Sequence, residues 1–86
     1  MAIFSNIETV TPETASIILA NNPNNRTVSK TKTNEYASLM AAGMWALNGQ
    51  ALIIDEDGAL IDGQHRLHAC MISGVPFQSL VVRGIP

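Results

Sequence analysis

The fold is decided by a stretch in the second half of the chain, Ala51-Leu52-Ile53-Ile54-Asp55-Glu56-Asp57-Gly58-Ala59-Leu60-Ile61-Asp62-Gly63-Gln64-His65-Arg66-Leu67. Residues 51–55 form a short apolar run rich in β-branched side chains, which is typical of a strand. Residues 56–58 have the chemistry of a tight turn and precede a second apolar run at residues 59–61. The stretch therefore predicts two strands joined by a turn.

A helix is expected directly after Gly63. Gly74 is a typical C-terminal stop, and Pro76 follows just beyond it. Apolar side chains are dense between the two glycines, and they are Leu67, Ala69, Cys70, Met71 and Ile72. This density predicts a mostly buried helix with the polar residues 62–66 at its start.

The start of this helix is a candidate anion site. The first N–H groups of a helix have no partner within the helix, and its dipole makes that end electropositive. Gly63 lets these donors approach an anion, and Arg66 adds a guanidinium fork. Asp62 is expected either to cap the helix or to contact a ligand, and the two roles are compatible. Phosphate or a carboxylate is the ligand class that this pattern favours.

Two further helices are expected earlier in the chain. Thr11 before Pro12 and Glu13 predicts the start of the first helix, which ends in the asparagine-rich residues 21–25. Ser29 is the expected cap of the second helix, which Gly43 ends. Helical spacing places on one face of it Thr33, Tyr36, Leu39 and Met40. A last strand is expected over about residues 78–83.

Composition narrows the classes of partner. The 86 residues carry a formal charge of −2 with only five Lys and Arg residues, which argues against duplex DNA. Arg26, Lys30 and Lys32, together with Arg66, can instead form one local positive pocket suited to a nucleotide. The apolar fraction of 47% is high, so either an apolar face serves oligomerisation or the chain is part of a longer protein, and both remain open.

Location follows from what the sequence lacks. A single cysteine cannot form an internal disulfide, no apolar stretch reaches twenty residues, and the N-terminus has no basic start of a signal peptide. These features predict a cytoplasmic protein without a membrane span.

The hexapeptide of residues 62–67 resembles the signature of the ParB/sulfiredoxin superfamily, specifically its DGQHR-type ParB-like nuclease-domain proteins, which are common in phages and mobile elements. The similarity covers about residues 25 to 85. Its other landmarks are, in order, Asn25-Arg26, Met40, Gly43, Trp45, Asn48-Gly49-Gln50, the Asp55 to Gly58 turn and Gly74. The resemblance implies a single α+β domain over residues 1–86 with a small mixed β-sheet and about three helices. Residues 1–24 would be an N-terminal helix and linker, and residues 25–86 the core.

Departures from the superfamily narrow the expected chemistry. Sulfiredoxins carry a nucleophilic cysteine at the position of Gln64, so sulfiredoxin activity is not expected here. Cys70 lies six residues later and is expected to be a small buried hydrophobe. ParB proteins carry an acid at the position of Gln64 and an arginine at that of His65, so the ParB route of CTP hydrolysis is not expected either. Phosphate binding through Gly63 and Arg66 is retained.

The resemblance implies a domain that binds a nucleotide or another phosphate-bearing ligand. The expected ligand-binding residues are Gly63, Gln64, His65, Arg66, Arg26, Asn48 and Gln50. His65 and Asp62 are candidate acid–base groups for phosphodiester or nucleotide hydrolysis. Whether such a reaction uses Mg²⁺ as a cofactor is left open by the sequence. His65 and His68 have the spacing of a metal-binding pair but lack further ligands, so no metal site is predicted.

Two alternatives stay open at this point. The chain can instead be a phage-encoded interaction protein that inhibits or regulates a host protein through an apolar surface, or it can form a homo-oligomer.

Trp45 is expected to pack in the core, with base stacking as the alternative.

Overall fold

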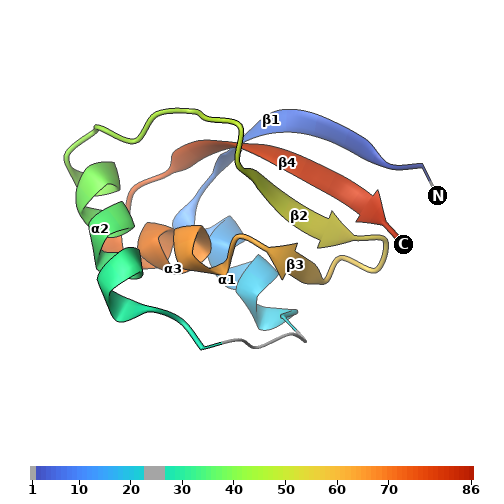
Figure 1. Cartoon of the computed structure of the whole chain (residues 1–86), viewed down its shortest axis with the longest axis horizontal. Helices are drawn as coiled ribbons and strands as arrows, with labels where there is room; N and C mark the ends of the chain where they lie inside the picture. Colours follow the sequence, from blue (N-terminus) through green and yellow to red (C-terminus); the bar gives the residue numbers. More distant parts are fainter. Residues whose placement is uncertain (1, 23–26) are drawn as a thin grey trace.

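The computed structural model describes residues 2–22 and 27–86. Along the chain its elements are β1 (Phe4–Val10), α1 (Pro12–Ala20), α2 (Lys30–Ala41), β2 (Ala51–Asp55), β3 (Leu60–Asp62), α3 (Gln64–Ser73) and β4 (Phe77–Ile85). The four strands form one mixed sheet (Figure 1). The expected α+β class, with three helices in the described residues, is confirmed.

The sheet has the strand order β1-β4-β2-β3. β4 is antiparallel to β1 and parallel to β2, and β3 returns antiparallel to β2. The predicted turn between β2 and β3 is present: the Oδ1 atom of Asp55 accepts the N–H groups of Asp57 at 2.9 Å and of Ala59 at 2.8 Å. β4 is therefore the strand that joins β1 to the β2-β3 hairpin.

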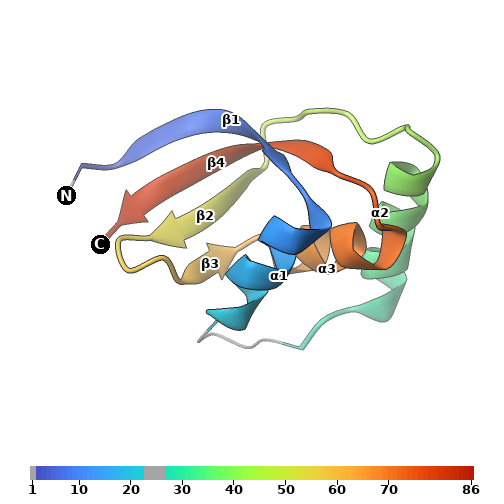
Figure 2. The same ribbon diagram turned by 180° about the vertical axis from the view of Figure 1, so that it is seen from behind.

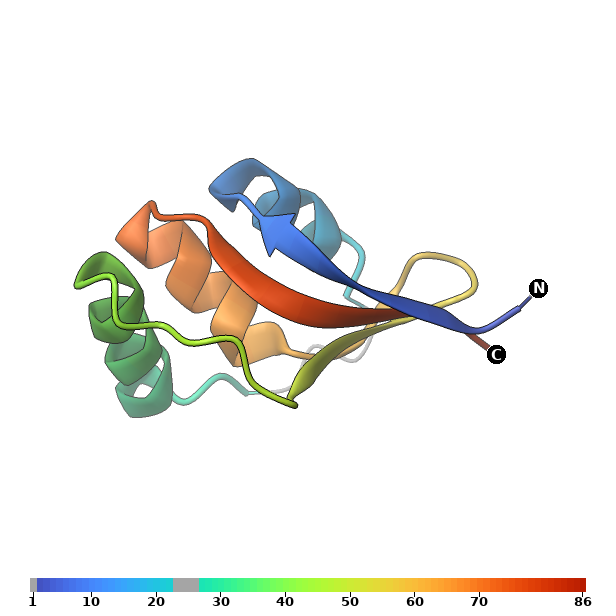
Figure 3. The same cartoon turned by 90° about the horizontal axis from the view of Figure 1, so that it is seen from above.

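All three helices lie on one face of the sheet (Figures 1 and 2). α3 lies between α1 and α2 (Figure 3). The core fills the space between the two layers. Its buried apolar residues are Val10, Leu52, Ile54, Leu60, Phe77 and Val81 from the strands, and Ala15, Ile18, Ala37, Met40, Leu67, Ala69 and Cys70 from the helices.

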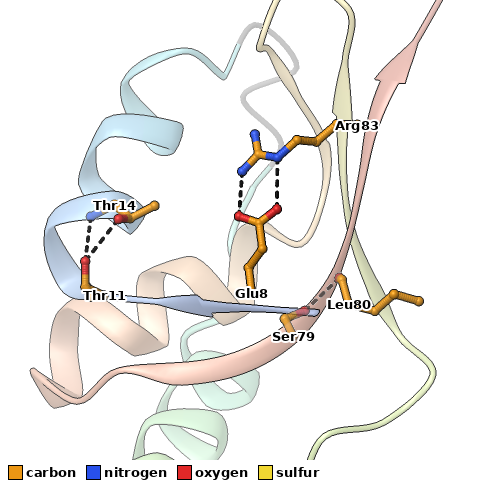
Figure 4. Close-up of polar contacts among 6 residues, drawn as sticks. All are labelled: Glu8, Thr11, Thr14, Ser79, Leu80 and Arg83. Atoms are coloured by element: carbon orange, nitrogen blue, oxygen red, sulfur yellow. Dashed lines mark hydrogen bonds and ion pairs between the residues drawn. The ribbon is translucent and has the colours of Figure 1, made fainter. Parts of the chain in front are cut away.

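The helix boundaries follow the capping chemistry of the sequence. The Thr11 hydroxyl accepts the N–H of Thr14 at 3.1 Å, and Pro12 begins α1 (Figure 4). The Ser29 hydroxyl accepts the N–H of Lys32 at 3.2 Å at the start of α2. Gly74 ends α3 in the left-handed conformation. These three predictions, which depend only on local chemistry, are confirmed.

The N-terminal strand was not expected. The sequence predicted a helix and a linker over residues 1–24, but Phe4–Val10 is β1 and pairs along its whole length with residues 77–83. That pairing joins residues more than sixty positions apart, and no local signal reports it. The asparagine-rich linker falls partly on residues 23–26, outside the described residues.

The structure corrects the expected burial of Met71 and Ile72, and it decides two points that the sequence left open, at Leu39 and Asp62. Leu39 is exposed on α2, where Ala37 is buried instead. Met71 and Ile72 are 44% and 61% exposed, because α3 turns only one side toward the sheet and its neighbouring helices. Asp62 is not the cap of α3; it is the last residue of β3, and Gly63 is the cap.

Candidate functional site

A cavity of about 430 Å³ opens where the start of α3 meets α2 and the β2-β3 hairpin. Residues 62–66, the motif singled out in the sequence, form one wall of it. The lining residues are Thr27, Lys32, Tyr36, Gln50, Ala51, Ile53, Asp62, Gly63, Gln64, His65 and Arg66. The fold therefore collects the polar motif in a concave site rather than on an open surface.

Gly63 occupies a position that only glycine fits. Its φ of 113° lies in the region that L side chains rarely adopt. A Cβ built at this position would overlap the Cδ2 methyl group of Leu52, which is fully buried in the core. Gly63 also leaves the first turn of α3 without a side-chain cap. The glycine therefore permits close packing of the motif on β2. This steric role is separate from the expected role of Gly63 in letting an anion approach the backbone N–H groups.

Arg66 is buried, with 7% of its surface exposed, and it binds backbone. Its two terminal nitrogens donate to the carbonyl oxygens of Gln50 at 3.2 Å and of Ala51 at 3.0 Å. These bonds use two of the five guanidinium N–H donors. Burial lowers the pKa of Arg66, and attraction to Asp62 and then to Tyr36 opposes that shift. Arg66 thus ties the start of β2 to α3, and the carbonyl oxygens explain how a cation is held at the electropositive end of a helix.

His65 connects α3 to α2. Its Nε2 atom accepts the backbone N–H of Ser29 at 3.0 Å, which places the ring proton of the neutral imidazole on Nδ1. A protonated ring would carry hydrogen on both nitrogens and could not accept this bond. The bond therefore ties the ring to the N-cap residue of α2, in the wall of the cavity.

Asp62 and Gln64 flank the glycine. The Oδ1 atom of Asp62 accepts the N–H of Gly63 at 2.9 Å, and the residue is exposed. Gln64 is buried with 7% of its surface exposed. Both line the cavity.

Of the remaining expected site residues, one lines the cavity, one does not, and one lies outside the described residues. Gln50 lines the cavity, and its N–H is held at 2.9 Å by the side chain of Asn48, which is not among the lining residues. Asn48 therefore shapes the turn before β2 rather than the cavity wall. Arg26 lies outside the described residues.

α2 and the segment just before it contribute lining residues that the sequence analysis did not single out as site residues. Lys32 lines the cavity, whereas Lys30 does not, although the sequence grouped both with Arg66. Tyr36 was expected only on a helix face, and Thr27 was missed. The Nζ atom of Lys32 lies 5.8 Å from the centre of the Tyr36 ring, a cation–π arrangement. Only the packing of α2 on α3 reveals this wall.

Trp45 is partly buried and packs against the core. Its ring makes edge-to-face contacts with Tyr36 at 5.2 Å and with Phe77 at 5.7 Å between ring centres. It is not among the lining residues of the 430 Å³ cavity. Tyr36, in contrast, does line that cavity.

The described residues contain neither a metal-binding cluster of side chains nor a helix that could span a membrane. Within residues 2–22 and 27–86, no three His, Cys, Asp or Glu side chains lie close enough together to hold a metal ion. In the same part of the chain, no helix has the length and apolar character needed to cross a membrane.

The fold and the cavity define a small α+β domain with a polar hollow at the amino end of a helix. Comparison with models of known protein families, with curated proteins and with solved structures gave no match. The resemblance to the ParB/sulfiredoxin superfamily therefore stays a prediction.

Proposed function

We propose that this domain binds a nucleotide or another phosphate-bearing ligand in the cavity lined by residues 62–66, as the ParB-like phage proteins that it resembles are expected to do. The observation that carries the proposal is the charge of the cavity. Its described lining includes two cations, Lys32 and Arg66, against one carboxylate, Asp62, in a chain whose formal charge is −2. A concave site with excess positive charge favours an anionic ligand.

The two cations differ in burial and bonding, which supports different tasks for them in the proposed site. Arg66 is buried and donates to the carbonyl oxygens of Gln50 and Ala51. It therefore holds the start of β2 in the cavity wall and adds positive potential to the cavity. Lys32 is exposed on the facing helix and is the cation that can move onto a phosphate. The amino end of α3, which lacks a side-chain cap, adds the positive end of a helix dipole.

The proposal concerns binding, and it does not include hydrolysis. The Nε2 atom of His65 already accepts the Ser29 N–H, and one oxygen of Asp62 accepts the Gly63 N–H. A general base needs a lone pair directed at the proton that it removes. The accepting nitrogen of His65 is thus engaged with the backbone at the start of α2, and one oxygen of Asp62 is engaged with the backbone of the motif.

Isothermal titration calorimetry with Lys32→Gln and Lys30→Gln tests the proposal. The two lysines lie two positions apart in the first turn of α2 and are both exposed, but only Lys32 lines the cavity. The titrants are a panel of ribonucleoside triphosphates with and without magnesium, the corresponding nucleosides, and inorganic phosphate. We expect Lys32→Gln to weaken triphosphate binding by about tenfold, equivalent to about 1.4 kcal/mol, and Lys30→Gln to leave it within about twofold.

Two results would contradict the proposal. One is the absence of heat from every phosphate-bearing titrant, and the other is equal weakening by both lysine variants, which would indicate a diffuse charge effect. Arg66→Ala is less informative, because it removes the support of β2 together with any contact to the ligand.

A second candidate function, binding of a host protein through an apolar surface, is favoured by one observation. Large apolar side chains are exposed on all three helices, and examples are Ile17 at 73%, Leu39 at 40% and Ile72 at 61%. An interaction protein of this kind should keep its partner after Lys32→Gln and lose it when these exposed residues are made polar.

A further inference from the structure

The outer edge of β1 is open. β1 is the first strand in the sheet order and, in the described part of the chain, pairs with β4 alone. In an antiparallel strand, alternate residues direct their N–H and C=O groups to opposite sides. About half of the backbone groups of Phe4–Val10 therefore face away from the sheet, and such an edge is a template for another strand.

This edge lacks the usual protection. Natural edge strands are commonly blocked by proline, by lysine or by short length. β1 has seven residues without proline or lysine, and apolar side chains are exposed on and beside it: Ile3 at 58%, Phe4 at 49% and Ile7 at 58%. The ends of β1 and β4 near the termini also project beyond the helices (Figures 1 and 3).

The edge is also free of net charge. Glu8 is the only charged residue of β1, and its carboxylate accepts two hydrogen bonds from Arg83 on β4, at 3.0 Å from Nε and 2.8 Å from the terminal nitrogen (Figure 4). The ion pair lies within one chain and neutralises Glu8. Two copies of this edge can therefore approach without repulsion between like charges.

We propose that β1 pairs antiparallel with β1 of a second copy of this chain around a twofold axis at Ser5, so that the two sheets join into one of eight strands. In this register Ile3 of each copy lies opposite Ile7 of the other, on the face away from the helices. Glu8 lies opposite Ala2. Directly opposed apolar side chains are the main source of stability in an antiparallel pair, and a twofold contact of this kind is closed.

Neighbouring registers match the side chains less well. An axis at Asn6 places Phe4 opposite Glu8 and Ile3 opposite Thr9. An axis at Ile7 opposes the two Ile7 residues but leaves Ile3 beyond the paired region. The register at Ser5 is the one that pairs both isoleucines of each copy.

Light scattering coupled to size-exclusion chromatography tests the proposal. We expect the chain to elute with twice its monomer mass of 9.2 kDa, and Ile7→Lys to elute as a folded monomer. Ile17→Lys is the matched control, because Ile17 is 73% exposed but lies on α1, and it should remain a dimer. A monomeric parent protein at high concentration, or a dimer that survives Ile7→Lys, would overturn the proposal.

Cross-linking gives a second test that does not depend on the folding of Ile7→Lys. Ser5→Cys places two thiols on directly opposite residues, whose Cβ atoms are about 5 Å apart in such a pair, within reach of a short bismaleimide. Thr9→Cys is the control, because in the same register the two introduced thiols are about 27 Å apart, eight residues at about 3.4 Å each. The native Cys70 is fully buried and will not contribute. Equal cross-linking of both variants, or of neither, would refute this register and the dimer built on it.

Discussion

Gly63→Ala should destabilise the domain more than any other exchange of glycine for alanine in the hairpin and α3. Two terms contribute. The positive φ of 113° costs an alanine about 1–2 kcal/mol. The new methyl group also overlaps the buried Leu52 side chain, and overpacking of a core costs about 1–3 kcal/mol. The sum is about 2–5 kcal/mol, against a total stability of about 4–13 kcal/mol for a domain of this length.

Two other glycines separate these terms. Gly74 has a φ of 69° but open space around its Cβ position, so Gly74→Ala should show the backbone cost alone, about 1–2 kcal/mol. Gly49 has neither a positive φ nor a neighbour within 4 Å, so Gly49→Ala should change stability by less than about 0.5 kcal/mol.

Urea unfolding and thermal unfolding, both followed by circular dichroism, measure all three variants. A thermal midpoint at least about 8 °C below the parent is expected for Gly63→Ala. If Gly63→Ala lost no more stability than Gly74→Ala, the packing of the motif on β2 would be refuted. The cost of Gly63→Ala should also shrink in a Leu52→Ala background, since the methyl group then has room.

Two further predictions concern buried polar groups. Arg66→Lys should lower stability by about 1.5–3 kcal/mol in urea unfolding, because an ammonium group cannot reach both the Gln50 and Ala51 carbonyl oxygens; a variant as stable as the parent would mean that the fork holds nothing. Burial raises the pKa of Cys70, so the folded state keeps the thiol proton at a pH where the unfolded chain has lost it. Stability should therefore fall as pH rises above about 8.5, by up to about 1.4 kcal/mol per pH unit, and Cys70→Ala should remove this part of the slope; parallel pH profiles for parent and variant would contradict it.

The sequence predicted the elements whose signals are local. The turn at residues 56–58, the caps Thr11 and Ser29, and the end of α3 at Gly74 each depend on the conformational preference of a few neighbouring residues. β1 was missed because its partner is β4, at the other end of the chain. Exposure of Met71 and Ile72 depends on how many sides of α3 the fold covers, which the apolar pattern alone does not report.

The candidate site was predicted in part. Residues 62–66 do share one cavity wall, because they are consecutive at a strand-to-helix junction. The facing wall comes from α2, and Lys32 could not be separated from Lys30 before the packing of that helix was known. Arg66 was expected to contact a ligand, but its bonds go to backbone carbonyl oxygens sixteen and fifteen residues earlier, and a backbone carbonyl leaves no signal in the sequence.

The central place of β4 has a consequence for the order of folding. β1 is made first and β2 about forty residues later, yet neither pairs with the other, and both wait for residues 77–85. A ribosome must therefore synthesise the chain through Arg83, the last residue paired with β1, before β1 can pair along its whole length. Contacts this distant in sequence close slowly. Until then the apolar residues of β1 stay exposed on the nascent chain, where they are available to chaperones and to aggregation.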